Sequence, residues 1–224
     1  MAFAVLRGRR KTVTGTPGRT AIDNEIRVCS AHVRSPLDLP SSIGKLAEQS
    51  VRVLGWSGSL LPPLKLLGRH VVPVADLVPD AHAERLCLGS EPVLDRAEIA
   101  TWVWPEMDGR VPPPAARVTG VLAPARHWRS ALTAAVPFAR FTNTAIVVPR
   151  SVTVAPDFMS TCLIRARQFG IGVLSADGET VQSELEGRCF DDQPPVEHTA
   201  VSRWINEVVY QQLLAVEAPA PTRG

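Results

Sequence analysis

The chain has 224 residues, of which 45% are hydrophobic and 21% are charged, and its formal net charge is +2. This composition excludes a chain too polar to collapse and is typical of a globular protein with a sizeable core. The small net charge excludes a uniformly basic surface, so an electrostatic case for a nucleic-acid partner depends on local clusters. Apolar runs are all shorter than the roughly 18 residues of a membrane-spanning helix, and the first residues lack the order of a secretory signal. We therefore expect a cytoplasmic protein with no membrane partner.

The first 20 residues form a basic arm, which we expect to be flexible. Every cation in this arm precedes the first acidic residue, Asp23, and a Gly-, Thr- and Pro-rich segment typical of flexible linkers follows at residues 12–19. Two interpretations stay open, a solvated tail or an arm that contacts phosphates. The candidate nucleic-acid-binding residues of the arm are Arg7, Arg9, Arg10 and Lys11.

Residues 21–96 are expected to be a helical and irregular part of the chain. Ser41 or Ser42 can cap a helix whose apolar residues follow helical spacing from residue 43 to residue 54, and Gly55 is placed to end it. Prolines and glycines break residues 55–91 into short apolar pieces that the pattern does not assign. In one alternative, residues 60–67 form a second short helix, which would make residues 40–72 a winged-helix-like DNA-binding segment.

Residues 97–217 show the regular pattern of an α/β core, and residues 218–224 form a tail. We expect strands at 98–104, 117–123, 144–148, 171–176 and 179–185, the last two joined by a turn at Asp177 and Gly178. Helices are expected at 126–136, from Pro156 to a stop at Gly170, and at 199–216, after an acidic linker at 191–195. The second helix should place Phe158, Cys162, Ala166 and Phe169 on one face, and the last should turn Val201, Ile205, Val208, Val209 and Leu213 inward. This order predicts an α/β fold with a mixed central sheet flanked by helices.

The motifs that usually carry enzyme chemistry are missing or misplaced. Residues 170–172 begin like a dinucleotide fingerprint, but they lie between a helix and a strand, whereas the fingerprint follows a strand and opens a helix. Ser57 misses the nucleophile position of G-x-S-x-G by one residue. The histidines show no metal-binding spacing, and the cysteines are expected to be core thiols. We therefore assign no cofactor and no metal. The cysteines are Cys29, Cys87, Cys162 and Cys189.

The tryptophans offer a second candidate for nucleic-acid binding. Trp102 and Trp104 would share one face of the expected strand at 98–104, and burial of that face is the simpler interpretation. Arg126 and Arg129 lie close to Trp128 in the sequence, and a surface on which bases stack needs aromatic rings beside cations. We therefore add these two arginines to the candidate nucleic-acid-binding residues.

Three segments share a pattern with one known superfamily. Residues 118–124 run into an apolar helix near residue 128, residues 145–149 form an apolar strand, and residues 166–174 join a helix to a strand. In this respect the stretch 98–185 resembles the restriction-endonuclease-like, or PD-(D/E)XK, superfamily. The resemblance implies a helix followed by a β-hairpin, helix, strand, helix and strand. It also implies an acid on the first hairpin strand, and a carboxylate, one residue and a lysine on the second, for metal-dependent attack on phosphodiesters.

The chain departs from this superfamily at the catalytic positions. Leu122 and Pro124 stand where the carboxylate and the lysine belong, and only Glu98 or Asp95 could stand for the first acid. Every lysine of the chain lies upstream of this hairpin, so no shift of register restores the motif. Arginine cannot replace the lysine, because it stays protonated and cannot deprotonate water. We interpret the chain as a degenerate member, a non-catalytic binding or regulatory module associated with nucleic acid.

One enzyme hypothesis stays open beside this interpretation. A metal-dependent hydrolase could use acidic residues that are dispersed in the sequence and meet only in the fold, since no spacing excludes such a site. Examples of such acids are Asp80, Glu84, Asp95 and Glu98.

Overall fold

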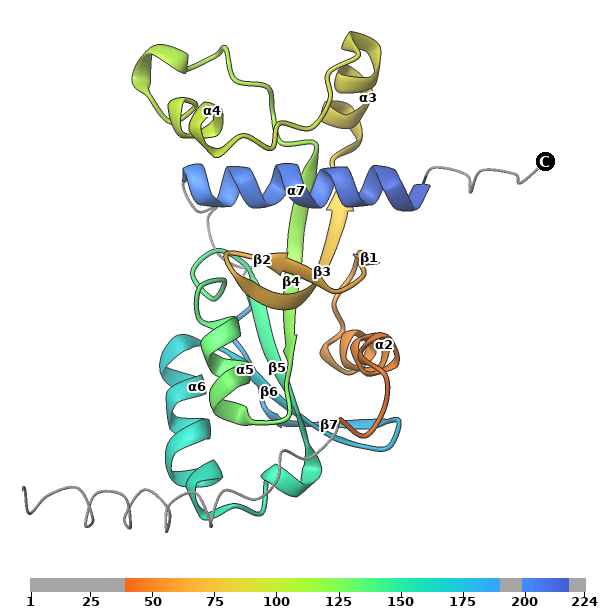
Figure 1. Cartoon of the computed structure of the whole chain (residues 1–224), viewed down its shortest axis with the longest axis vertical. Helices are drawn as coiled ribbons and strands as arrows, with labels where there is room; N and C mark the ends of the chain where they lie inside the picture. Colours follow the sequence, from red (N-terminus) through yellow and green to blue (C-terminus); the bar gives the residue numbers. More distant parts are fainter. Residues whose placement is uncertain (1–38, 190–198, 218–224) are drawn as a thin grey trace, which may run out of the picture. The chain divides into compact units, whose positions relative to one another are not determined.

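The computed structural model describes residues 39–189 and 199–217, which form a mixed α/β fold (Figure 1). Its sheet has seven strands in these residues, in the order β1-β3-β4-β5-β6-β7, with β2 paired to β3 outside this path. Strands β4, β5 and β6 are parallel, and β3 and β7 flank them in the antiparallel direction. The predicted fold class is therefore confirmed. The strands are β1 (Ser59–Leu60), β2 (Leu64–Leu66), β3 (Arg69–Leu77), β4 (Ala116–Pro124), β5 (Asn143–Pro149), β6 (Gly172–Asp177) and β7 (Thr180–Leu185).

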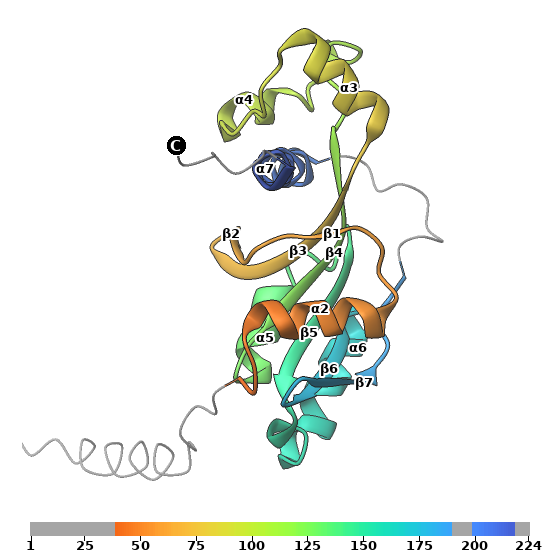
Figure 2. The same cartoon turned by 90° about the vertical axis from the view of Figure 1, so that its right-hand side faces the viewer.

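Helices cover both faces of this sheet. One face packs on α2, which runs across the strands (Figure 2), and the other packs on α5, α6 and α7. None of the described helices is both long and apolar enough to cross a membrane. The helices are α2 (Ile43–Leu54), α3 (Pro79–Leu88), α4 (Arg96–Thr101), α5 (Trp128–Ala135), a π-helix (Phe158–Leu163) that runs into α6 (Ile164–Phe169), and α7 (Ala200–Glu217), with short 3-10 turns at Pro105–Met107 and Arg150–Val152.

Helix α2 has the predicted start and end. The side chain of Ser42 accepts a hydrogen bond from the backbone N–H of Lys45, which satisfies one of the free donors of the first turn. Gly55 ends the helix in the left-handed conformation, with φ of 65°, and its N–H donates to the Arg52 carbonyl. Leu46 and Ala47 are buried against the sheet, so this helix closes one face of the core.

The parallel strands form the predicted buried centre of the sheet. All residues of β5 are buried, and their side chains alternate between the two faces, as the twofold period of a strand requires. Ala145 and Val147 pack on the side of α2, whereas Ile146 and Val148 pack on the side of α5. Strand β4, the β6–β7 hairpin, α5 and α7 also lie close to their predicted positions.

The helix that follows Pro156 has the predicted stop at Gly170 and most of the predicted buried face, including Ala166. Phe158 and Cys162 are buried, and burial raises the pKa of the Cys162 thiol to about 11. Phe169, predicted to share this face, is 45% exposed. Phe169 is the last residue of α6, directly before the helix-ending Gly170. Val201, predicted to point inward from the last helix, is also exposed, near the first turn of α7.

The predicted strand at 98–104 is wrong. Its first residues form α4, whose start is capped by Asp95, since the Asp95 Oδ1 accepts a hydrogen bond of 2.8 Å from the Ala97 N–H. A turn follows, and Trp104 is 57% exposed, not buried on a strand face. The antiparallel partner of β4 is instead β3, which comes from the part of the chain before residue 97.

The second helix of the winged-helix alternative is also absent. Residues 60–67 contain strands β1 and β2 instead, and β2 pairs with β3 through a tight turn. Leu67 and Gly68 form this turn with φ of 48° and 76°, the positive values that two-residue hairpins favour. Pro62 and Pro63 precede β2 and lack the N–H donors that a helix needs.

A buried polar network joins α3 to α7. The guanidinium of Arg85 forms two hydrogen bonds, of 2.7 and 2.6 Å, with the carboxylate of Glu207, and both side chains are almost fully buried. Glu207 also accepts a hydrogen bond from the backbone N–H of Val93. The Tyr210 ring lies under the Arg85 guanidinium, and its hydroxyl is 3.0 Å from Nδ1 of His82. Charge pairing in a dry environment therefore holds the α3 segment on α7.

We predict that Glu207→Gln destabilises the protein by about 3 kcal/mol or more, because it leaves the Arg85 cation buried without a counter-charge. Urea unfolding followed by circular dichroism measures this change. Glu179→Gln is the control, because the ion pair between Lys45 and Glu179 is well exposed and should contribute little. Equal stability of the two variants would contradict the role given to the buried pair.

Candidate functional site

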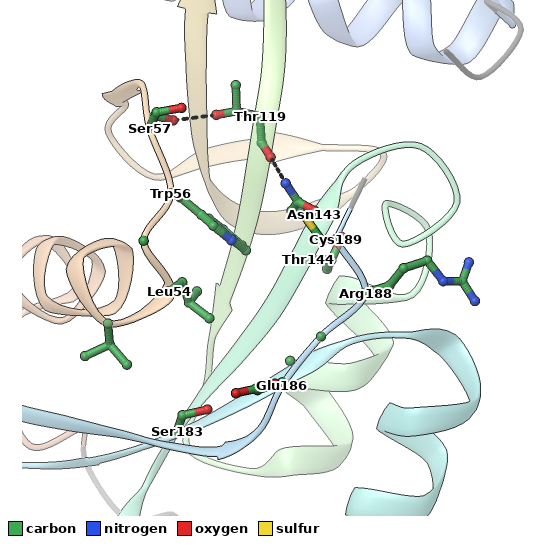
Figure 3. A pocket seen from close by; sticks show the side chains of 14 residues that line it. Leu54, Trp56, Ser57, Thr119, Asn143, Thr144, Ser183, Glu186, Arg188 and Cys189 are labelled. Atoms are coloured by element: carbon green, nitrogen blue, oxygen red, sulfur yellow. Dashed lines mark hydrogen bonds between the residues drawn. The ribbon is translucent and has the colours of Figure 1, made fainter. Parts of the chain in front are cut away.

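A pocket of about 380 Å³ opens beyond the C-terminal end of α2 (Figure 3). Its floor includes Asn143 and Gly172, the first residues of β5 and β6, which places it at the amino ends of these parallel strands. One wall is the end of α2 and the residues after it, 53–57, and the other is the segment 186–189 that follows β7. We call this site the Trp56 pocket, after the aromatic side chain in its first wall.

The ring of Trp56 is held in place by a glycine on the neighbouring strand. A Cβ atom at Gly120 of β4 would lie only 2.3 Å from Cε3 of the indole, so the ring occupies space that any other residue would fill. The backbone N–H of Trp56 donates to the Val51 carbonyl, which completes the turn that Gly55 begins. The end of α2 and the absence of a side chain at residue 120 together fix the indole as a wall of the pocket.

The opposite wall also depends on close backbone approach. A Cβ atom at Gly187 would lie 2.7 Å from the backbone nitrogen of Gly172. The N–H of Arg188 donates a 2.8 Å hydrogen bond to the carbonyl of Gly170, and the Arg188 side chain packs over that glycine. In Figure 3 the guanidinium of Arg188 points away from the pocket, whereas the Glu186 side chain points toward Ser183.

Some polar groups of the pocket have hydrogen-bond partners in the protein, and others do not. The side-chain amide of Asn143 donates 2.9 Å to the Thr119 carbonyl, and the Thr119 hydroxyl donates to the carbonyl of Ser57, so these residues hold β4, β5 and the first wall together. Within the described residues, the indole N–H of Trp56 and the carboxylate of Glu186 have no hydrogen-bond partner. The pocket therefore combines an aromatic ring, one donor and one unpaired carboxylate.

The structure does not bring the predicted nucleic-acid-binding residues to this pocket. Arg126 and Arg129 follow the last residue of β4, at the carboxyl edge of the parallel strands, which is the opposite edge. Arg129 forms an ion pair of 2.9 Å with Asp157 and lies over the ring of Trp128. Trp128 itself is 5% exposed, so it offers no free face for a base. The arm residues Arg7, Arg9, Arg10 and Lys11 lie outside the described residues.

The other candidate residues are separate from the pocket. Asp80 and Glu84 lie on α3, and Asp95 and Glu98 lie at the start of α4. In the described part of the chain, no group of three or more His, Cys, Asp or Glu side chains is arranged to hold a metal ion.

The cysteines follow the sequence prediction only in part. Cys162 is a core thiol, as predicted. Cys87 and Cys189 are exposed, so the prediction is wrong for these two, because each lies outside the apolar faces that pack on the sheet. Cys29 lies outside the described residues.

Sequence reasoning did not select Trp56 or Glu186. Gly55 and Gly170 are the predicted helix stops. Gly55 directly precedes Trp56 in the sequence, and Gly170 is contacted by the side chain of Arg188. A tryptophan directly after a helix-ending glycine was the available clue, because the left-handed residue turns the next side chain back toward the core. The sequence did not indicate that Gly120 would receive this ring.

We predict that Gly120→Val displaces the Trp56 ring and destabilises the protein by about 1–3 kcal/mol, because the added atoms overlap the indole. Tryptophan fluorescence and urea unfolding measure the two effects. Gly44→Ala is the control, since a Cβ atom there meets nothing within 4 Å, and it should leave the stability equal or slightly higher. Unchanged fluorescence in Gly120→Val would contradict the contact.

Comparison with known proteins gives no relative from which the ligand of this pocket could be taken. No family model matches the chain, and no characterised protein or solved structure matches it. What the pocket binds must therefore be argued from its own side chains.

Proposed function

We propose that the chain is a non-catalytic binding module built on a nuclease-like fold, and that the Trp56 pocket is its binding site. The observation that carries this proposal is the preformed pocket itself. Its aromatic wall is fixed by Gly120, while the polar groups of Trp56 and Glu186 have no partner within the described residues. Small-molecule sites are typically preformed cavities with an apolar wall and a few polar groups that orient the ligand.

The order of the elements supports the nuclease-like part of the proposal. Helix α2 precedes the antiparallel pair β3–β4, and α5, the parallel strand β5, α6 and the parallel strand β6 follow. This is the order that the resemblance implies, with the first hairpin strand at β3 and with α3 and α4 inserted inside the hairpin.

The absence of catalysis is proposed from the position of Leu122. This residue stands where the family carries a metal-binding carboxylate, and it is fully buried in the apolar cluster beneath α2. A carboxylate at this position would be buried without donors or a counter-charge, and a metal ion would lack the oxygen ligands that it requires. We therefore expect no cleavage of plasmid DNA with Mg²⁺ or Mn²⁺. Nicking that copurifies with the protein and that disappears in Asp80→Asn or Glu84→Gln would contradict this proposal.

The binding role is tested with a panel of small probes in ligand-observed NMR. The panel holds alkylammonium and guanidinium ions, carboxylates, neutral alcohols, monosaccharides and nucleosides. We expect at least one class to bind the wild-type protein and the control variant Trp104→Ala, whose ring is exposed and lies outside the pocket. The same class should bind Trp56→Ala several times more weakly, because the aromatic wall is lost.

Trp56→Phe accompanies Trp56→Ala, so that a loss of folding is not mistaken for a loss of binding. The phenyl ring keeps part of the wall, and its affinity should lie between those of the wild type and the alanine variant. The proposed site would be contradicted if no probe class binds, or if the affinity of the bound class is the same in the wild type, Trp56→Phe and Trp56→Ala.

A nucleic-acid partner is a second proposal, and it concerns the opposite edge of the sheet. Arg126, Arg129 and Arg150 are exposed and lie at the carboxyl ends of β4 and β5, the edge at which open α/β sheets usually bind ligands. Arginine side chains at such an edge can contact phosphates.

We predict that the full chain shifts a duplex oligonucleotide in a salt-dependent way. The variant Arg126→Glu with Arg129→Glu should weaken the binding, because each substitution replaces a phosphate-attracting cation with an anion. The control is Arg167→Glu on α6. A role for this edge would be contradicted if the double variant binds the oligonucleotide as tightly as the Arg167→Glu control does, or if binding is insensitive to salt.

A further inference from the structure

We infer that the Trp56 pocket receives a cationic group, an alkylammonium or a guanidinium, an inference that rests on the proposed binding role of the pocket. The exposed apolar residues of α3 and of the segments beside α4 have no occupant that the structure indicates. The Arg85–Glu207 pair is closed off in the core, where Nε of Arg85 is the one buried side-chain polar atom of the described residues without a hydrogen-bond partner. The Trp56 pocket remains, and its electrostatic character selects a class of ligand.

Three features of the pocket favour positive charge. The first is the indole ring of Trp56, whose face attracts cations through its quadrupole. The second is the Glu186 carboxylate, which lines the pocket and has no cationic partner within the described residues. The third is the C-terminal end of α2 at Leu54 and Gly55, where the aligned peptide dipoles leave a partial negative charge.

The arginines near the pocket do not cancel these features. Arg188 lines the pocket, but its side chain packs over Gly170, with Nε 3.1 Å from the place of a Cβ atom there. Figure 3 shows its guanidinium directed away from Trp56 and Glu186. Arg52 lies in the last turn of α2 and is exposed, and it is not among the residues that line the pocket. The negative groups therefore face the pocket, and the nearest positive groups do not.

The size of the pocket agrees with a side-chain-sized cation. Its volume of about 380 Å³ lies at the lower end of the range for ligand sites, roughly 300–1,000 Å³. An anion such as phosphate would meet the Glu186 carboxylate and the helix end, while the guanidinium of Arg188 is directed away from them. The same cationic chemistry can come from a free amine or guanidine, or from a lysine or arginine side chain of a partner protein.

The test uses isosteric probes with the full chain in low salt. Butylammonium and ethylguanidinium are compared with neutral butanol and with butyrate by ligand-observed NMR. We expect saturable binding of the two cations with dissociation constants on the order of millimolar, a loss of about two- to fivefold in Trp56→Ala, and weaker binding as salt is raised. Butanol and butyrate should bind at least several times more weakly than the cations.

The variant Glu186→Gln isolates the charge, because the exposed side chain keeps its shape and should not disturb folding. It should weaken cation binding about two- to fivefold, whereas Glu184→Gln, on β7 and outside the pocket lining, should not. Butanol or butyrate binding as tightly as butylammonium would overturn the inference, as would unchanged cation binding in Glu186→Gln. If another probe class binds in a Trp56-dependent way, the cation inference falls and the proposed function stands. If no class binds, both fall.

Blocked tripeptides separate the two sources of the cation. Acetyl-Gly-Arg-Gly-amide and acetyl-Gly-Lys-Gly-amide are compared with acetyl-Gly-Gln-Gly-amide and with the free cations. Peptides that bind at least as tightly as the free cations support a side chain of a partner protein. Free cations that bind while the peptides do not support a small amine or guanidine ligand.

Discussion

The ring of Trp56 and a side chain at residue 120 cannot occupy the same space, and the candidate site depends on this constraint. Glycine at 120 lets the indole lie directly on β4, at a distance that even a methyl group would forbid. Gly55 directs the chain to this position by ending α2 in the left-handed conformation. Close approach at Gly172 and Gly187 then brings the second wall against the sheet. Glycines that are far apart in the sequence thus allow the two walls to pack closely on the sheet, because they carry no side chain there.

We propose different partners for the two edges of the parallel strands. At the amino edge, Glu186 and the end of α2 favour donors and cations, whereas at the carboxyl edge Arg126 and Arg150 favour anions. One sheet can therefore present two binding surfaces of different chemistry without a conflict of charge. Between the two edges the strands are buried on both faces, and Leu122 belongs to this apolar interior. The proposed binding sites therefore lie at the edges of the sheet and not at its buried centre.

Much of the fold was predictable because its elements are local and periodic. Helix α2 follows from its serine cap and terminal glycine, and β5 follows from its apolar run between turns. The strands and helices of residues 55–104 were not predicted, because their sequence departs from the usual preferences of these elements. Pro73 lies inside β3, where proline is disfavoured, yet its carbonyl accepts a hydrogen bond from Leu61. The pocket was not predictable, because it joins segments that only the sheet brings together. The capping pattern of Asp95 and Glu98, which marks the start of α4, was present in the sequence but was outweighed by an apparent apolar alternation.

The indole N–H resonances of the protein test the central claim most directly. The chain has five tryptophans, and the resonance of Trp56 can be assigned in ¹H–¹⁵N spectra from its absence in Trp56→Phe. If the pocket is the binding site, titration with butylammonium or ethylguanidinium shifts the Trp56 resonance in a saturable way and leaves those of Trp102, Trp104, Trp128 and Trp204 in place. A Trp56 resonance that stays fixed while the others move, or while a ligand demonstrably binds, would contradict the account.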